Sequence, residues 1–186
     1  HRRQRSIDSG RAVAKAAIVA GSTGVLGIGN NTFNIAGDIF SFLGAGLATP
    51  TGDSRIVPTE GFGTNVFNIA SNATVFGSQA GISVGARVNV LTNLGNVGSA
   101  NANAVHFLWH PNTLNNAGNI RTAGSVADAV MIEHGNNSIT NSGIIESDTG
   151  DALQINEGQN IIVNSGIMRG ARGIALPRSG LPSNSI

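Results

Sequence analysis

The chain has 186 residues, of which only 11% are charged and 4% aromatic, whereas 26 are glycine, and its formal net charge is +1. This length suffices for one domain with a substantial core, and the composition requires small aliphatic side chains rather than aromatic rings to fill that core. Because cysteine is absent, a disulfide framework and a thiolate metal site are both excluded.

Residues 1–20 are predicted to form a basic tail followed by a cap. Five of the eleven basic residues fall in the first fifteen positions, and we interpret them as a solvated terminus to which no partner is assigned. Residues 11–20 are predicted to form a short cap helix or a first strand, either of which would cover an open sheet end. The apolar run 12–20 is interrupted by Lys15 and is far shorter than the roughly 20 residues of a membrane span.

Residues 21–176 are predicted to form one repetitive domain that contains a loop excursion. The segments NTFNIAGDI, from Asn31, and NVFNIASNATV, from Asn65, are interpreted as two degenerate repeats. Between them, residues 44–63 contain two prolines and several glycines, which favour a loop that leaves the repeat and returns to it.

The second half of the chain repeats two short phrases with one period. The first phrase reads LTNLGNV, LNNAGNI, ITNSGII and IVNSGIM, with starts 23, 25 and 23 residues apart at Leu91, Leu114, Ile139 and Ile162. The second phrase, which reads AVHF, AVMI, ALQI and GIAL, keeps the same step, and its apolar residues alternate as in a strand. A period of about 23 residues with Gly/Asn corners predicts an all-β fold, a right-handed parallel β-helix (β-solenoid) with one coil per repeat.

Stacked coils would align equivalent residues in columns along the axis. Aliphatic columns are predicted to fill the interior, and the glycine of the first phrase is predicted to supply a positive φ or to remove a Cβ at a corner. The asparagine two residues before that glycine is predicted to form a structural ladder in which each amide bonds the next. The members of this ladder are Asn93, Asn116, Asn141 and Asn164.

The residue that follows the last apolar position of the first phrase predicts a charge ladder. On the repeat register Arg121, Glu146 and Arg169 share a column, with Glu146 between the two arginines. Alternating signs avoid the repulsion that like charges on adjacent strands would suffer. An alternative interpretation makes Arg121 and Arg169 an anion-binding site for an acidic glycan.

The segments NSGII and NSGIM, with the following GDALQI and RGIAL, resemble the repeats of the right-handed β-helical passenger domains of bacterial autotransporters and related secreted adhesins. The resemblance extends over residues 65–176 and implies an extracellular or cell-surface rod used in adhesion, aggregation, or matrix or filament building. Self-association end to end or side by side is expected, with a cell-surface glycan as a second candidate partner. Residues 177–186 lose the repeat and are predicted to be a tail or cap.

Few side chains suggest chemistry. Asp128 and Asp151 are one period apart, so their carboxylates would lie ~5 Å apart, as in a retaining glycosidase, but Asn103 in the same column favours a turn position that accepts Asx residues. Together with Trp109 and His134 they form a candidate glycan or ion site, although His134 has no metal-ligand spacing to another histidine.

The sequence predicts a non-catalytic structural or adhesive protein without metal, cofactor or nucleic acid. The alternative is a glycan-binding or glycan-cleaving β-helix, such as a tailspike-like lyase or hydrolase.

Overall fold

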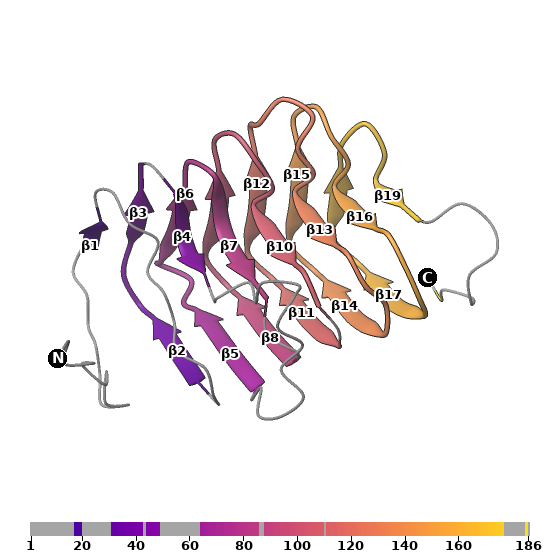
Figure 1. Ribbon diagram of the computed structural model, residues 1–186, viewed down its shortest axis with the longest axis horizontal. Coiled ribbons are helices and arrows are strands. Elements are labelled where there is room, and N and C mark those ends of the chain that lie inside the picture. The colour runs from indigo at the N-terminus through magenta and orange to yellow at the C-terminus, as the bar shows by residue number, and fades with distance from the viewer. Residues whose placement is uncertain are drawn as a thin grey trace, which may run out of the picture.

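Three parallel β-sheets wind into a solenoid in the computed structural model of the protein (Figure 1). The fold is therefore the all-β parallel solenoid that the repeats predict. Every regular element is a strand within the residues that the structure describes, which are 17–19, 31–42, 44–48, 64–85, 88–109, 111–176 and 185. In this part of the chain no helix is long and apolar enough to cross a membrane.

The chain runs through the three sheets, here named A, B and C, in the repeating order C, A, B. Sheet C consists of β2 (Asn31–Ile35), β5 (Thr64–Ile69), β8 (Val88–Asn93), β11 (Asn112–Asn116), β14 (Asn137–Asn141) and β17 (Asn160–Asn164). Sheet A consists of β1 (Ala17–Val19), β3 (Ile39–Ser41), β6 (Thr74–Gly77), β9 (Asn96–Ser99), β12 (Asn119–Thr122), β15 (Ile144–Ser147) and β18 (Ile167–Arg169). Sheet B consists of β4 (Ala45–Ala48), β7 (Ala80–Val84), β10 (Val105–Phe107), β13 (Val130–Ile132), β16 (Leu153–Ile155) and β19 (Ile174–Ala175).

Parallel pairing within each sheet sets the period of the solenoid. In sheet C, Leu114 lies opposite Leu91 on one neighbouring strand and opposite Ile139 on the other, and Ile139 in turn lies opposite Ile162. These steps of 23, 25 and 23 residues are the steps of the sequence repeat. Each repeat is therefore one coil, and equivalent residues stack along the axis.

Alternating burial along the strands builds the interior. In β14 the side chains of Asn137, Ile139 and Asn141 are buried, whereas Ser138 and Thr140 are exposed, as expected for a strand with one face on a core. Aliphatic side chains dominate the interior columns, and one such column is at most 2% exposed along four coils, at Leu91, Leu114, Ile139 and Ile162. Burial of these columns supplies the main stabilising free energy, at about 25 cal/mol for each Å² of apolar surface removed from water.

The glycine of the repeated phrase is required by close stacking of the backbone. A Cβ added to Gly118 would lie 2.1 Å from the carbonyl oxygen of Gly95, and Gly143 and Gly166 stand in the same relation to the coil before each. None of these four glycines has a positive φ. Of the two explanations that the sequence left open, removal of the Cβ therefore applies.

The N-terminal segment contributes a strand to sheet A. Strand β1 pairs in parallel with β3, and Ala17 lies opposite Ile39. Of the two alternatives for residues 11–20, the structure shows a strand at residues 17–19. The rest of residues 1–20, including the basic tail, lies outside the described residues.

The loop excursion begins later than the sequence predicts. Residues 45–48 form β4, which pairs with β7 and buries Ala45 and Leu47, so the expectation of a loop from residue 44 is wrong for this stretch. The sequence AGLA of β4 does not indicate a strand, because it contains only alanine, glycine and leucine and none of the β-branched or aromatic residues that are typical of strands. Residues 49–63 lie outside the described residues. In the predicted C-terminal tail, Ser185 forms a parallel bridge with Ile161 of β17.

Candidate functional site

The predicted asparagines lie in one column at the end of the sheet C strands. Each side-chain amide donates to the Oδ1 of the next asparagine along the axis, at 2.8 Å from Asn93 to Asn116, 2.7 Å from Asn116 to Asn141 and 2.7 Å from Asn141 to Asn164. At the first coil of this ladder Oδ1 of Asn93 is buried without a hydrogen-bond partner, because the residue opposite it on β5 is Ile69. Asn164, at the other end, is exposed.

A second amide ladder, missed by the sequence analysis, runs along the start of the same strands. Its three best-formed contacts measure 2.8, 2.9 and 2.7 Å, and its members are at most 3% exposed. The ladder consists of Asn65, Asn89, Asn112, Asn137 and Asn160. The sequence did contain a signal for it, namely an Asn-x-apolar-x-Asn pattern that opens each of the last four sheet C strands or lies within it.

The second ladder also fixes the corner between sheets B and C. The amide of Asn112 donates to the backbone carbonyl of Trp109, that of Asn137 to His134, and that of Asn160 to Glu157. Asn112 and Asn137 thus each bind the corner of their own coil while they bond the next coil, and Asn160 binds its corner while it accepts from the preceding coil. The two contacts of one amide nitrogen therefore couple corner geometry to coil stacking.

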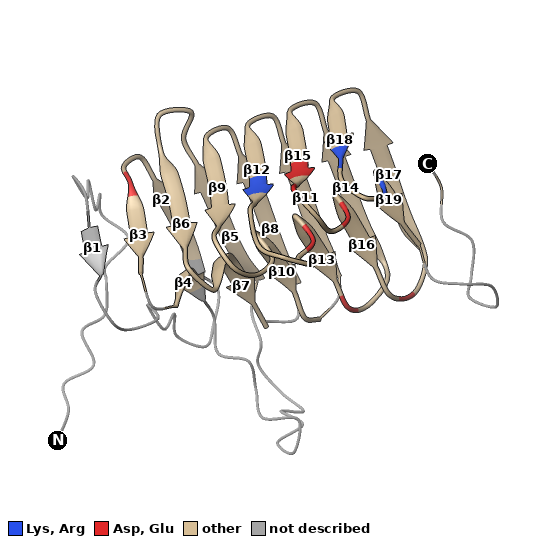
Figure 2. Cartoon of the chain, turned by 90° about the horizontal axis from the view of Figure 1, so that it is seen from above, with Lys and Arg blue, Asp and Glu red and all other residues tan. Residues whose placement is uncertain are grey.

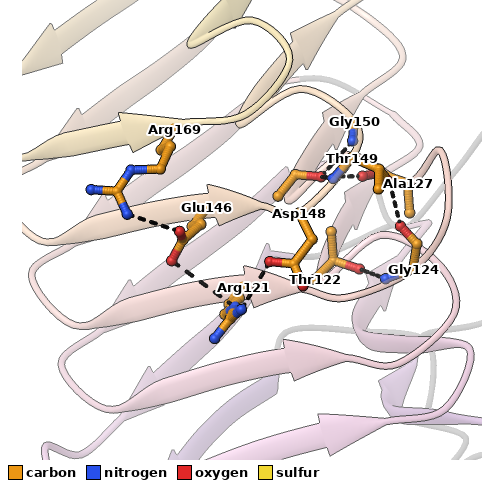
Figure 3. A network of polar contacts seen from close by, with 10 residues as sticks. Arg121, Thr122, Gly124, Ala127, Glu146, Asp148, Thr149, Gly150 and Arg169 are labelled. Carbon is orange, nitrogen blue, oxygen red and sulfur yellow. Dashed lines mark hydrogen bonds and ion pairs between the residues drawn. The ribbon is translucent and has the colours of Figure 1, made fainter.

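Glu146 lies between two arginines on sheet A (Figure 3). Its Oε1 accepts a hydrogen bond from Arg169 Nη1 at 3.1 Å, and its Oε2 lies 4.0 Å from Arg121 Nε. Arg121 has a closer partner that the sequence analysis did not identify, Asp148 Oδ1 at 2.9 Å, and this hydrogen bond raises the pKa of Arg121. The Glu146 side chain is only 22% exposed, whereas both arginines are at least 60% exposed.

An open polar hollow adjoins this charge ladder at the corner after β15 and β18. It has a volume of about 480 Å³ and is lined by Glu146, Asp148, Thr149 and Arg169, among others. Every arginine of the ladder contacts a carboxylate. The same carboxylates would repel an acidic glycan that approached Arg121 and Arg169, which weighs against the anion-site interpretation.

Asp128 and Asp151 lie in a column that caps backbone amides from coil to coil. Oδ1 of Asn103 accepts the N–H of Asp128 at 2.9 Å, and Oδ1 of Asp128 accepts the N–H of Asp151 at 2.8 Å. Asp151 accepts the N–H of Arg172 and binds its guanidinium through both oxygens, at 2.9 and 2.6 Å. Burial raises the pKa of Asp128, and the hydrogen bond to Asp151 raises that of Arg172.

Trp109 and His134 lie together at the corner between sheets B and C. Their rings stack with centroids 5.1 Å apart and planes 12° from parallel, and His134 Nδ1 lies 3.0 Å from Glu157 Oε2 on the next coil. A second pair of a histidine and a glutamate is formed by His106 and Glu133, with Nε2 and Oε1 3.0 Å apart. Neither glutamate was identified from the sequence.

The structure does not bring the four residues of the predicted glycan or ion site together. Asp128 precedes β13 and His134 follows it, so the six residue steps from one position to the other, across a strand, cover about 20 Å of extended chain. The pair Trp109 and His134 therefore lies far from the pair Asp128 and Asp151. Among the described residues no group of three or more His, Cys, Asp or Glu side chains could hold a metal ion. His1 and His110 lie outside the described residues.

No family model matches the chain, and the comparisons found neither a similar curated protein nor a similar solved structure. A function for this chain is therefore inferred from its sequence repeats and from the geometry of its side chains.

Proposed function

We propose that this chain is a non-catalytic structural or adhesive β-solenoid that works outside the cell or at a bacterial cell surface. The observation that carries this proposal is that several carboxylates form contacts between neighbouring coils. Glu146, Asp151, Glu133 and Glu157 each contact a cationic side chain or a histidine on a neighbouring coil. Side chains arranged in this way hold coils in register, which is what a rod requires.

The repeated phrases support the extracellular part of the proposal. The segments NSGII and NSGIM are similar to repeats of autotransporter passenger domains and secreted adhesins, and their two asparagines, Asn141 and Asn164, are ladder members in the structure. A neutral surface rich in Asn, Ser and Thr also suits a rod that acts at a surface without a charged partner.

Two measurements test the proposal. Negative-stain microscopy of the purified chain should show short rods, and a panel of polysaccharides should remain uncleaved. Cleavage that is abolished by Asp151→Asn, but not by a substitution at the other corner such as Glu157→Gln, would contradict the proposal and favour a glycan-cleaving β-helix.

Glycan binding without cleavage is the second candidate, and the Trp109 corner favours it. Trp109 is the only tryptophan of the chain, its side chain is 41% exposed, and its ring lies against His134 beside Glu157. An exposed indole next to hydrogen-bonding side chains suits a sugar, which presents both C–H groups and hydroxyls. Glycan-array binding that is abolished by Trp109→Ala would support this candidate if it is preserved in Phe42→Ala, a control at an even more exposed aromatic residue on another corner.

A further inference from the structure

The outward face of sheet C, here called the C face, carries no charge. None of its six strands contains Asp, Glu, Lys, Arg or His. Along these strands the inward positions hold the two amide ladders and apolar side chains. The outward positions hold only Thr, Ser, Asn, Val and Ile.

The other two faces differ from the C face. Sheet A presents Arg121, Glu146 and Arg169 (Figure 2). In sheet B the strands β10, β13 and β16 have three residues each, and charged side chains such as Glu133 follow them directly. Within the described residues, the C face is therefore the broad uncharged surface of the solenoid.

We propose that the C face is the contact through which two copies of this chain associate side by side, an inference that rests on the structural role proposed above. In an isologous contact the same patch lies on both copies, and identical residues meet where the two-fold axis passes through it. Charges near that axis would repel their own copies and charges elsewhere would need partners of opposite sign, whereas an uncharged face meets itself without repulsion. Parallel strands with constant spacing also give both copies the same corrugation, which suits the aligned packing of two sheets.

The side chains on the C face are of the kind that pack between sheets. Threonine, valine and isoleucine are β-branched and lose little rotamer freedom on burial. At the last coil the face becomes fully apolar, because Ile161 and Val163 stand where the preceding coil has Ser138 and Thr140. These two side chains are 58% and 56% exposed, and a second copy would cover them.

The size of the face predicts a weak contact. With strands ~4.8 Å apart and a rise of ~3.3 Å per residue, six strands of five or six residues cover about 29 by 17 Å, or about 500 Å² per copy. A pair of copies would bury about 1,000 Å², which is the lower limit for a specific interface. We therefore expect reversible, concentration-dependent association, which becomes strong only where many copies lie together on a surface.

Sedimentation velocity of the full chain, from about 10 µM to 1 mM, tests the inference, since weak contacts become populated in this range. The wild type should associate reversibly. Asn115→Lys adds a charge to an exposed position of the central strand β11 and should weaken association at least about tenfold through like-charge contact. The control Asn119→Lys adds the same charge to an exposed position of β12 on sheet A and should leave association unchanged.

A charge-swap mixture identifies the partner as the same face. Equal amounts of Asn115→Lys and Asn115→Glu should associate more tightly than either variant alone, and Thr140→Lys provides a second charged variant if Asn115→Lys does not fold. A wild type that is monomeric throughout, equal weakening by Asn119→Lys, or a mixture that gains nothing would each overturn the inference. Rods that stay monomeric would leave the proposed structural role intact, whereas cleaved polysaccharide would remove that role independently of association.

Discussion

The side-chain amide of Asn116 donates a hydrogen bond to Oδ1 of Asn141 on the next coil, at 2.7 Å, and both side chains are buried. The same contact recurs on either side of this pair, from Asn93 to Asn116 and from Asn141 to Asn164. A member in the middle of the column both donates and accepts, whereas the last member, Asn164, is exposed. The position of an asparagine in the column therefore decides what its loss leaves unpaired.

Replacement of Asn141 by alanine should lower the free energy of unfolding by about 1–3 kcal/mol, because the buried amide of Asn116 loses its shortest hydrogen bond and keeps only the longer contacts with the backbone carbonyls of Gly118 and Ile144, at 3.2 and 3.1 Å. Asn164→Ala is the matched control and should cost less, since Asn164 is itself exposed and water can take its place as the acceptor of the Asn141 amide. Urea denaturation of both variants measures the difference. Equal costs would show that burial does not govern the ladder.

Asn137→Ala should alter the corner of its coil as well as the stacking of the coils. The amide of Asn137 bonds both the carbonyl of His134 and Oδ1 of Asn160, so its loss frees the corner on which the ring of Trp109 stacks. Because Trp109 is the only tryptophan, its fluorescence reports on this corner alone. We expect a red-shifted emission in Asn137→Ala.

The control for this experiment is Asn141→Ala, at the opposite end of the same strand. It should destabilise the solenoid without a shift in Trp109 emission under native conditions. A shift of the same size in both variants would mean that the two ladders do not act on separate corners.

The sequence predicted those features that depend on the coil period alone. The period places Asn116 over Asn141 and Glu146 between two arginines, and the structure shows these neighbours. The second ladder was missed because its asparagines lie at the strand starts, before the phrase that was aligned. Asp148 was missed because its contact with Arg121 runs diagonally between coils, which a register of directly opposite residues does not show.

The candidate site illustrates why a shared repeat does not place residues together. Trp109 and His134 occupy one point of the coil cross-section, and Asp128 and Asp151 occupy another. Residues group into a site in a solenoid only when they share a position along the coil, as Trp109, His134 and Glu157 do. Composition and sequence proximity carry no such information, so they could not separate these two positions.

Asp128→Asn should keep or raise the free energy of unfolding at pH 7. Burial raises the pKa of Asp128 above its ordinary value near 3.8, so the folded state binds the proton more tightly than the unfolded state. Stability therefore falls as pH rises from the ordinary value through the raised pKa, and the charge costs stability above it. Asparagine removes this charge and keeps the Oδ1 acceptor for Asp151, as Asn103 does for Asp128 on the preceding coil.

Asp128→Ala is the contrasting variant, because it removes the acceptor together with the charge. It should cost about 1–2 kcal/mol at pH 7 through the unpaired N–H of Asp151. Urea unfolding between pH 3 and 7 checks both statements. A loss of stability in Asp128→Asn at pH 7 that grows with rising pH would show that the Asp128 charge is stabilising, against the direction argued here.

Glu146→Lys should destabilise the solenoid in a salt-dependent way. The substitution places three cations in one column of adjacent strands, where Glu146 now contacts Arg169 at 3.1 Å and lies 4.0 Å from Arg121. Loss of these partly exposed pairs and the added repulsion should cost about 0.5–2 kcal/mol at low ionic strength. Because the Debye length shrinks to about 3 Å at 1 M salt, part of this cost should disappear there.

Urea is the suitable denaturant, since guanidinium is itself a salt. Glu146→Gln provides the control: it removes the attraction without adding repulsion, so its smaller cost should also shrink as salt weakens the wild-type pairs. A cost of Glu146→Lys that does not change with salt would show that packing of the half-buried side chain, and not its charge, holds this column in register.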